Sequence, residues 1–378
     1  MTQIPTPSSK PTLAILFGGR SGEHEVSLMS ARSVLSVLDR ARYNVIEVGI
    51  THEGAWLTGQ DALAAFEQGK TEALLPASLH PDPSRPGLYV IRNTQYVKYT
   101  DVDVYFPVLH GTYGEDGTLQ GLLEMADVAY VGANVPSAAV GMDKGIFKDV
   151  MRANDIPVVE AVVVLRAEIE NDMEGVLARV AALGAYPLFV KPANLGSSVG
   201  VTKCRSRSDV AEALMDAAQY DRRVLIERGV PNPREIEIAV LGNDRPEASV
   251  PGEIIPGADF YSYDAKYVLE GSRPVIPAAL SEAQIAQIKD IALRAYKAVD
   301  CCGMARVDFL LDPDSPAGGE IFLNEINTIP GFTRISMYPK LWEASGLPYA
   351  DLVDRLIALA LERKAERDRT VRQYRRDA

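Results

Sequence analysis

The sequence has few residues that bind soft metals or form covalent cross-links. Its 378 residues include three cysteines, Cys204, Cys301 and Cys302, and four histidines. Three cysteines cannot make a disulfide framework, and no CxxC pair or Cys/His cluster has the spacing of zinc ligands. A disulfide-stapled domain is excluded and a zinc site is disfavoured. We interpret Cys301 and Cys302 as buried core thiols.

Long hydrophobic runs are also missing. No stretch approaches the roughly 18 apolar residues that a membrane-spanning helix needs. Residues 1–11 are polar and contain proline, and the first apolar run, residues 13–17, is too short for a signal peptide. We therefore expect a cytoplasmic protein without membrane attachment.

Positive charge is in deficit, with 39 lysines and arginines against 51 acidic residues and a net charge of −12. Nucleic acids are bound mainly through clustered lysine and arginine, so a nucleic-acid partner is disfavoured. Hydrophobic residues make up 47% and charged residues 24% of the chain, which is typical of globular proteins and excludes a disordered one. The length predicts two or three domains.

The order of apolar runs and glycine-rich turns predicts an α/β protein. Strands are expected at 12–17, 43–50 and 103–109, and the first leads through a glycine-rich turn into a helix, as in a mostly parallel sheet. Residues 53–100 are expected to be an insertion with local helices or hairpins. Strands and helices alternate over 158–224, and two strands follow at 305–311 and 320–327. Residues 347 to about 375 are expected to be helical, with a charged tail from about 362.

Those last two strands carry the clearest pattern of polar side chains. Side chains alternate along a strand, so Arg306 and Asp308 share one face, and Glu325 and Asn327 share a face of the next strand. Paired as a hairpin, the strands would bring Asp308, Glu325 and Asn327 together beside Arg306. Such oxygen ligands suit Mg²⁺ or Mn²⁺. The alternative is a hairpin with a solvated polar face.

A second pattern suits phosphate. The strand at 188–192 ends in Lys191-Pro192 and enters a loop, 193–200, that is rich in glycine and serine. Its backbone N–H groups and the lysine could hold a polyphosphate, although a plain surface turn has the same composition. Lys144 begins an expected helix, where a cation opposes the helix dipole, so a functional reason is favoured. Neither a Walker A motif nor GxGxxG is present, which disfavours a P-loop enzyme and a Rossmann oxidoreductase.

Six motifs together resemble the D-alanine–D-alanine ligase family. In order between about residues 13 and 361, they are GGRSGEHEVS at 18–27, HGTYGEDG at 110–117, VKP with GSSVG within 190–200, YDAKY at 263–267, RVD at 306–308 and NEINTIPG at 324–331. The resemblance implies a three-domain ATP-grasp fold of the α/β class. A Rossmann-like parallel-sheet domain would span 12–133, a central domain 134–229 and a C-terminal domain 230–378, after a flexible tail at 1–11.

The resemblance also implies a reaction. ATP would phosphorylate the carboxylate of one D-alanine, and the amine of a second D-alanine would displace the phosphate. The products would be ADP, phosphate and D-alanyl-D-alanine, a peptidoglycan precursor. Two Mg²⁺ or Mn²⁺ ions would be held by Asp308, Glu325 and Asn327, and the protein would be a homodimer.

The family's functional positions can be matched to residues of this sequence. Glu23 would pair with the ammonium of the first D-alanine, and Arg306 and the backbone N–H of Gly331 would stabilise the developing oxyanion. Residues 260–267 would form a lid over the reacting groups. The catalytic residues would be Glu23, Ser197, Tyr267, Arg306 and Gly331. The substrate-binding residues would be Glu23, His110, Arg306, Gly331, Ser336 and Met337. The ATP-binding residues would be Lys144, Lys191, Ser197, Ser198, Glu227, Val230, Glu235 and Lys266.

Two other functions fit parts of the sequence. A D-alanine–D-lactate or D-alanine–D-serine ligase would share the fold and differ in the acceptor, and Tyr267 argues for D-alanine among these. A nucleotide-binding regulatory protein without turnover would not need the complete set of metal ligands, Arg306 and the lysines. The sequence therefore favours the D-alanine–D-alanine ligase.

Overall fold

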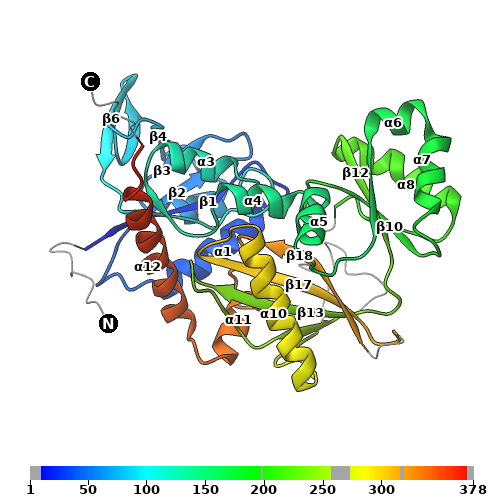
Figure 1. Ribbon diagram of the computed structural model, residues 1–378. Coiled ribbons are helices and arrows are strands. Elements are labelled where there is room, and N and C mark those ends of the chain that lie inside the picture. Colours follow the sequence, from blue (N-terminus) through cyan, green and yellow to red (C-terminus); the bar gives the residue numbers. More distant parts are fainter. Residues whose placement is uncertain (1–9, 197–198, 257–272, 316–318, 373–378) are drawn as a thin grey trace, which may run out of the picture.

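The computed structural model describes residues 10–196, 199–256, 273–315 and 319–372. These residues form three β-sheets, each with helices on it, as the ribbon diagram shows (Figure 1). The sheets fall within 12–133, 134–229 and 230–378, in sequence order. The expected α/β class is therefore confirmed, whereas the domain boundaries stay a prediction.

The first sheet has eight strands in the order β6-β5-β4-β3-β2-β1-β7-β8. Strand β1 pairs in parallel with β2 and β7, which confirms the parallel sheet. Residues 53–100 contain a short helix and hairpins, as expected, and their strands extend the same sheet. The elements are β1 (Thr12–Gly18), α1 (His24–Val37), β2 (Asn44–Ile50), β3 (Trp56–Thr58), α2 (Ala62–Glu67), β4 (Leu75–Leu79), β5 (Leu88–Arg92), β6 (Gln95–Thr100), β7 (Val104–Pro107), α3 (Thr118–Met125) and β8 (Ala129–Tyr130).

Two helices, α4 (Val135–Met142) and α5 (Lys144–Ala153), lead into the second sheet, which is antiparallel with the order β11-β10-β12-β9. Its helices bury apolar side chains against it, and these form a core of their own. The predicted alternation of strands and helices is confirmed, with one unexpected short helix, α6. The elements are β9 (Ala161–Leu165), α6 (Arg166–Asn171), α7 (Met173–Ala181), β10 (Leu188–Pro192), β11 (Thr202–Cys204), α8 (Arg207–Tyr220) and β12 (Arg223–Arg228).

The third sheet is antiparallel, in the order β16-β15-β13-β17-β18, with β14 on β13. Helix α10 packs its apolar side against β13 and β17. Helix α12 ends at Asp368, before the expected position near 375. The elements are β13 (Arg234–Leu241), β14 (Glu247–Ala248), β15 (Gly252–Ile255), β16 (Arg273–Val275), α10 (Glu282–Ala298), β17 (Met304–Asp312), β18 (Glu320–Asn327), α11 (Met337–Ala344) and α12 (Tyr349–Asp368).

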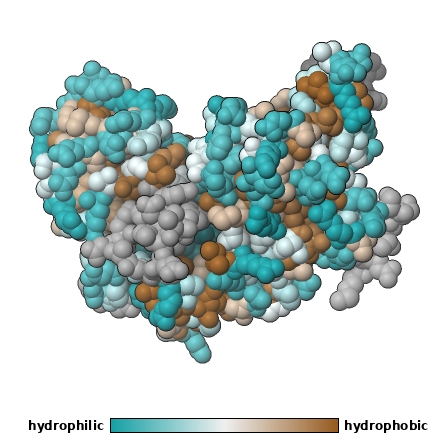
Figure 2. Space-filling view, turned by 180° about the vertical axis from the view of Figure 1, so that it is seen from behind, coloured by the Kyte–Doolittle hydropathy of each residue, from teal (hydrophilic) through white to brown (hydrophobic). Residues whose placement is uncertain are grey.

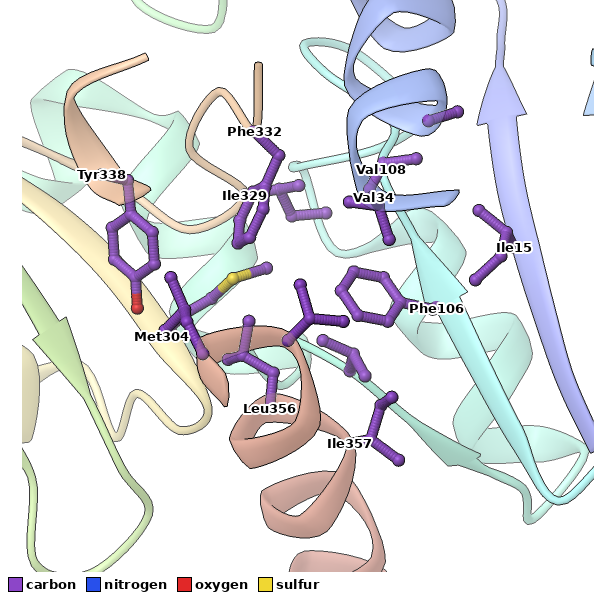
Figure 3. Packing of buried hydrophobic residues seen from close by; sticks show 14 of the residues in the cluster. Ile15, Val34, Phe106, Val108, Met304, Ile329, Phe332, Tyr338, Leu356 and Ile357 are labelled. Atoms are coloured by element: carbon purple, nitrogen blue, oxygen red, sulfur yellow. The ribbon is translucent and has the colours of Figure 1, made fainter. Parts of the chain in front are cut away.

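The first and third sheets share one hydrophobic core (Figure 3). Phe106 of β7 lies in it together with Met304 of β17 and Phe332 of the turn after β18. Helix α12 closes this core with Leu356 and Ile357. Because both sheets bury side chains in the same core, they are held together as one block.

The second sheet stands apart from that block. Seen from behind, it forms a separate lobe, and hydrophilic residues cover most of the visible surface (Figure 2).

Cys301 and Cys302 are buried, as expected of core thiols. Among the described residues, no helix is both long enough and apolar enough to cross a membrane.

The shared core makes a prediction about stability. Leu356 is 1% exposed and packs between the two sheets, so Leu356→Ala should lower the free energy of unfolding by about 3 kcal/mol. Leu361, on the same helix, is 41% exposed, so Leu361→Ala serves as the matched control and should change little. Urea unfolding followed by circular dichroism would measure both. An equal effect of the two substitutions would show that the core does not depend on α12.

Candidate active site

A cavity of about 1580 Å³ lies where the three sheets meet. It is lined by every predicted site residue that the structure describes. These are Glu23, His110, Lys144, Lys191, Glu227, Val230, Glu235, Arg306, Asp308, Glu325, Asn327, Gly331, Ser336 and Met337. Residues Ser197, Ser198, Lys266 and Tyr267 lie outside the described residues. The sequence therefore identified positions that the fold brings to one place from segments up to about 300 residues apart.

Glu23 lies at the N-terminal end of α1 and is nearly buried. Its Oε2 atom lies so close to Gly111 and Gly196 that a Cβ atom at either glycine would approach it to 2.6 or 2.8 Å. At Gly111, where φ is +74°, the backbone also favours glycine, whereas a side chain at Gly196 would require the Glu23 carboxylate to shift. The carboxylate of Glu23 faces the glycine loop after β7 and the loop after β10, which places it between the first and second sheets.

His110 joins the first sheet to the turn after β18. Its Nδ1 atom lies 3.0 Å from the carbonyl oxygen of Ile329, and its Nε2 atom lies 2.8 Å from Oγ of Ser30. Since a carbonyl only accepts, Nδ1 carries the proton and Nε2 accepts from the Ser30 hydroxyl. Burial lowers the pKa of His110 despite the neighbouring Glu23, so the imidazole is neutral.

Glu115 makes a second connection to the same turn. Its carboxylate accepts from the backbone N–H of Gly111 at 2.7 Å and from that of Ile329 at 3.1 Å. Burial, reinforced by the nearby Glu23, raises the pKa of Glu115 to about 8. Together with His110, it fixes the position of the turn that carries Gly331.

A side chain at Gly331 would require the hydroxyl of Ser336 to turn away. A Cβ atom there would lie 2.8 Å from Oγ of Ser336. Ser336 precedes α11, and its Oγ accepts from the backbone N–H of Thr333 at 3.1 Å. Met337, the first residue of α11, is buried behind it. The hydroxyl of Ser336 therefore lines the cavity beside Gly331, and a hydroxyl is a group that can donate to a carboxylate.

Strands β13, β17 and β18 place charged side chains in rows across the third sheet. Asp308 is opposite Glu237 on one side and Glu325 on the other, and Arg306 is opposite Asn327. The predicted hairpin is confirmed, with a β-bulge after Asp308. The convergence of charged side chains on this patch follows directly from the strand register.

Arg306 is bound by carboxylates. Its Nε and Nη2 atoms donate to the two oxygens of Asp308 at 2.7 and 2.6 Å, and Nε lies 3.0 Å from Glu237. Burial would lower the pKa of the guanidinium, but Asp308 and Glu237 raise it well above its ordinary value. Arg306 therefore stays charged and rigidly oriented, as a group that stabilises an oxyanion must be.

The same patch is the candidate metal site. Within the described ranges, no three His, Cys, Asp or Glu side chains gather closely enough to hold a metal ion by themselves. The predicted set instead combines two carboxylates with the amide of Asn327, whose Nδ2 donates to Asp308 at 2.9 Å. These oxygen donors fit a hard cation. Oδ2 of Asp308 already accepts from Arg306 and Asn327, whereas Oδ1 accepts from Arg306 and keeps a lone pair that a cation could use.

The second sheet and α5 form the opposite wall. Asp143 caps α5 by accepting from the backbone N–H groups of Gly145 and Ile146 at 3.0 and 2.9 Å. It also accepts from the side-chain amide of Asn194 at 3.0 Å, which anchors the glycine-rich loop. Lys144 donates from Nζ to the carbonyl oxygen of Leu195 at 2.6 Å. The helix start and the loop after β10 are therefore one unit.

Lys191 and Glu227 lie on the same face of the second sheet and form a buried ion pair. The second oxygen of Glu227 lies 2.9 Å from Nζ of Lys148, one helical turn after Lys144. Burial would raise the pKa of Glu227, but the two ammonium groups outweigh it and lower the pKa to about 2. Glu227 is therefore an ionised acceptor within the cavity. Val230 lies next to it, buried against Val159 and Phe322.

Two family models match this chain. A family model described as "D-ala D-ala ligase N-terminus" matches residues 12–133, and one described as "D-ala D-ala ligase C-terminus" matches residues 150–358. The chain belongs to the D-alanine–D-alanine ligase family. The family that its motifs indicated is therefore confirmed.

Individual relatives support the same family. The chain is 50% identical to a D-alanine–D-alanine ligase of Heliobacterium modesticaldum, over 95% of this chain and 97% of that protein. Among solved structures, the ligase of Coxiella burnetii is 40% identical with a TM-score of 0.81, covering 95% of this chain and 96% of that one. The VanG D-Ala:D-Ser ligase of Enterococcus faecalis is 34% identical with a TM-score of 0.82, covering 93% and 100%. The ATP-grasp fold is thereby confirmed.

Sequence reasoning missed three residues of this site. Glu115 lies within a motif that was singled out, but only the fold shows its contact with the turn after β18. Glu237 follows Glu235 by two residues, so strand alternation could have placed it on the cavity face. Lys148 follows Lys144 by four residues, which puts both on one side of α5.

The pairing of Glu227 makes a prediction with a pH dependence. Glu227→Gln should destabilise the protein at pH 7 by about 3–5 kcal/mol, because Lys148 would be left buried without a counter-charge. The pKa of Glu227 in the folded protein, about 2, lies below its ordinary value of 4.5. The ionised Glu227 carboxylate therefore stabilises the folded protein fully at pH values above 4.5, and this stabilisation is lost as the pH falls toward 2. Melting temperatures of both proteins between pH 7 and 3 should converge on the acid side. A constant gap would contradict the assigned pairing.

Proposed function

We propose that this chain ligates two molecules of D-alanine to D-alanyl-D-alanine at the expense of ATP, supplying a precursor of peptidoglycan. A carboxylate oxygen of the first D-alanine attacks the γ-phosphorus of ATP, and the bond to ADP breaks. The amine of the second D-alanine, having lost a proton, then attacks the acyl carbon, and phosphate leaves. The reaction is carbon–nitrogen bond formation, as in the ligase family to which the chain belongs.

The first and third sheets supply the amino-acid side of the cavity. Glu23 pairs with the ammonium of the first D-alanine, and His110 lies beside it. Arg306 and the backbone N–H of Gly331 donate to the oxyanion that forms during attack. Ser336, with Met337, receives the carboxylate of the second D-alanine. This assignment is supported by the buried, charged state of Arg306 and by the tight approach of Gly331 to Ser336.

The nucleotide side is formed by the second and third sheets. Lys144 and Lys191 bind the phosphates, while Glu227, Val230 and Glu235 hold the adenosine. Ser197, Ser198 and Lys266 complete this set, and Tyr267 joins the catalytic residues. Two Mg²⁺ or Mn²⁺ ions would be held by Asp308, Glu325 and Asn327, where they would neutralise charge on the phosphates.

One observation carries the proposal: all fourteen described residues that the family resemblance assigned line a single cavity. The ligase names of the relatives at 45–50% identity support D-alanine as the acceptor, while a D-Ala:D-Ser ligase is similar at 34%. We also infer a homodimer, a cytoplasmic location and domains at 12–133, 134–229 and 230–378 from the family.

The activity is tested directly by phosphate release. Purified protein should release phosphate from ATP only when D-alanine and Mg²⁺ are both present, and mass spectrometry should find D-alanyl-D-alanine. L-Alanine serves as the control, because the reaction is proposed for the D enantiomer. An equal rate with L-alanine would refute the stereochemical assignment. Faster turnover with D-serine than with D-alanine as the acceptor would show that D-serine is the second substrate.

The metal ligands are tested by substitution. Asp308→Asn or Glu325→Gln should lower kcat by at least about 100-fold, because charge neutralisation by a bound cation contributes several kcal/mol to the transition state. The matched control is Glu320→Gln, an exposed carboxylate on the same strand as Glu325. Circular dichroism would verify folding. Near-native kcat in both site variants would exclude these residues as metal ligands.

A further inference from the structure

A lysine is buried behind the nucleotide wall of the cavity. Lys148 is 1% exposed, and its Nζ atom lies 2.9 Å from Oε1 of Glu227. It does not line the cavity, whereas Glu227 and Lys191 do. Lysine is among the residues that are almost never fully buried unless they are paired. Its position therefore needs an explanation beyond the packing of α5.

The carboxylate of Glu227 has two ammonium partners in the structure. Lys191 reaches it from β10 and Lys148 reaches it from α5. These two lysines are the charged groups that most strongly affect Glu227, and Arg152 of α5 acts on Lys148 from further away. Two cations for one carboxylate exceed what neutralising a buried charge requires.

The two cations differ in what they can do. Lys191 is 13% exposed in its side chain and lines the cavity, so it can turn toward a bound nucleotide. Lys148 is enclosed on α5, one turn from Lys144, and does not line the cavity, so it stays beside Glu227 when Lys191 turns. If Lys191 turned away and Lys148 were absent, Glu227 would be a buried carboxylate without a counter-charge. Burial would then favour its protonated form.

We propose that Lys148 is a positioning residue of the nucleotide site that keeps Glu227 an ionised acceptor toward the base, so that the site selects adenine over guanine. This rests on the proposed use of ATP. An ionised carboxylate only accepts hydrogen bonds, so it matches the exocyclic amine of adenine and opposes the exocyclic oxygen of guanine. A protonated carboxyl group could donate to that oxygen. Lys148 acts on base selection through Glu227 and does not touch the nucleotide.

Lys148→Met tests the proposal, since methionine is apolar and unbranched like the lysine stem. Affinities for non-hydrolysable analogues of ATP and GTP would be measured by calorimetry between pH 6 and 9. The variant should bind the ATP analogue about tenfold or more weakly, the loss expected for one charge-assisted hydrogen bond. The preference for ATP over GTP should fall, and binding of the ATP analogue should weaken further as the pH decreases. The unmodified protein should show no such pH dependence.

Two controls separate this role from a structural one. Arg152→Met removes an exposed charge from the same helix and should leave both affinities unchanged. Lys148→Arg keeps the charge and should restore the preference for ATP. An unchanged ATP/GTP ratio in a folded Lys148→Met protein would overturn the proposal, whatever its melting temperature.

A double substitution covers the case in which Lys148→Met does not fold. Lys148→Met with Glu227→Gln removes both charges and should be more stable than Glu227→Gln alone. Its ATP/GTP ratio should equal that of Glu227→Gln, because Lys148 acts only through Glu227. A further change in the ratio would contradict the proposal. Binding is measured without D-alanine, so failure of the proposed ligation would appear separately, as absence of D-alanine-dependent phosphate release.

Discussion

The amino-acid side of the site depends on how one turn, residues 328–332, is held between two sheets. Its side chains Ile329 and Phe332 are buried in the core that the first and third sheets share. Its backbone is bound by His110 at the carbonyl of Ile329 and by Glu115 at the N–H of the same residue. Apolar burial therefore fixes where the turn lies, and two polar contacts fix its orientation. Gly331 and Ser336 obtain their geometry from this arrangement.

The buried Arg306 and Glu227 of the cavity are each paired with side chains of opposite charge from the protein itself. Arg306 is held by Asp308 and Glu237, and Glu227 is held by Lys148 and Lys191. Such pairing avoids the cost of an isolated charge in a poorly solvated place. A highly charged ligand can then enter by exchanging partners with groups that are already ionised. The net charge of −12 does not reveal this pairing, because it is a sum over all charged residues of the chain.

Much of this was predictable from the sequence, and the exceptions have physical reasons. The hairpin of β17 and β18 was predicted because alternation along a strand determines which side chains share a face. Glu115 was missed because its role depends on Ile329, a residue more than 200 positions away that no local pattern connects to it. Residues 53–100 were predicted as an insertion with local helices or hairpins, and they contain both, but their pairing onto the edge of the first sheet depends on contacts with β2 that no local pattern shows. Lys148 was missed because a lysine on a helix is usually solvated.

The distribution of hydrophobic cores has a mechanical consequence. The second sheet has a core of its own, whereas the first and third sheets are joined through a common one. The least tightly packed boundaries in the molecule are therefore those between the second sheet and its two neighbours. The boundary between the first and third sheets is closed by the shared core. Any rigid-body displacement would move Lys191 and Glu227 as a unit relative to Arg306 and Asp308. The nucleotide side of the cavity would widen or narrow, while the walls around His110 and Gly331 kept their shape.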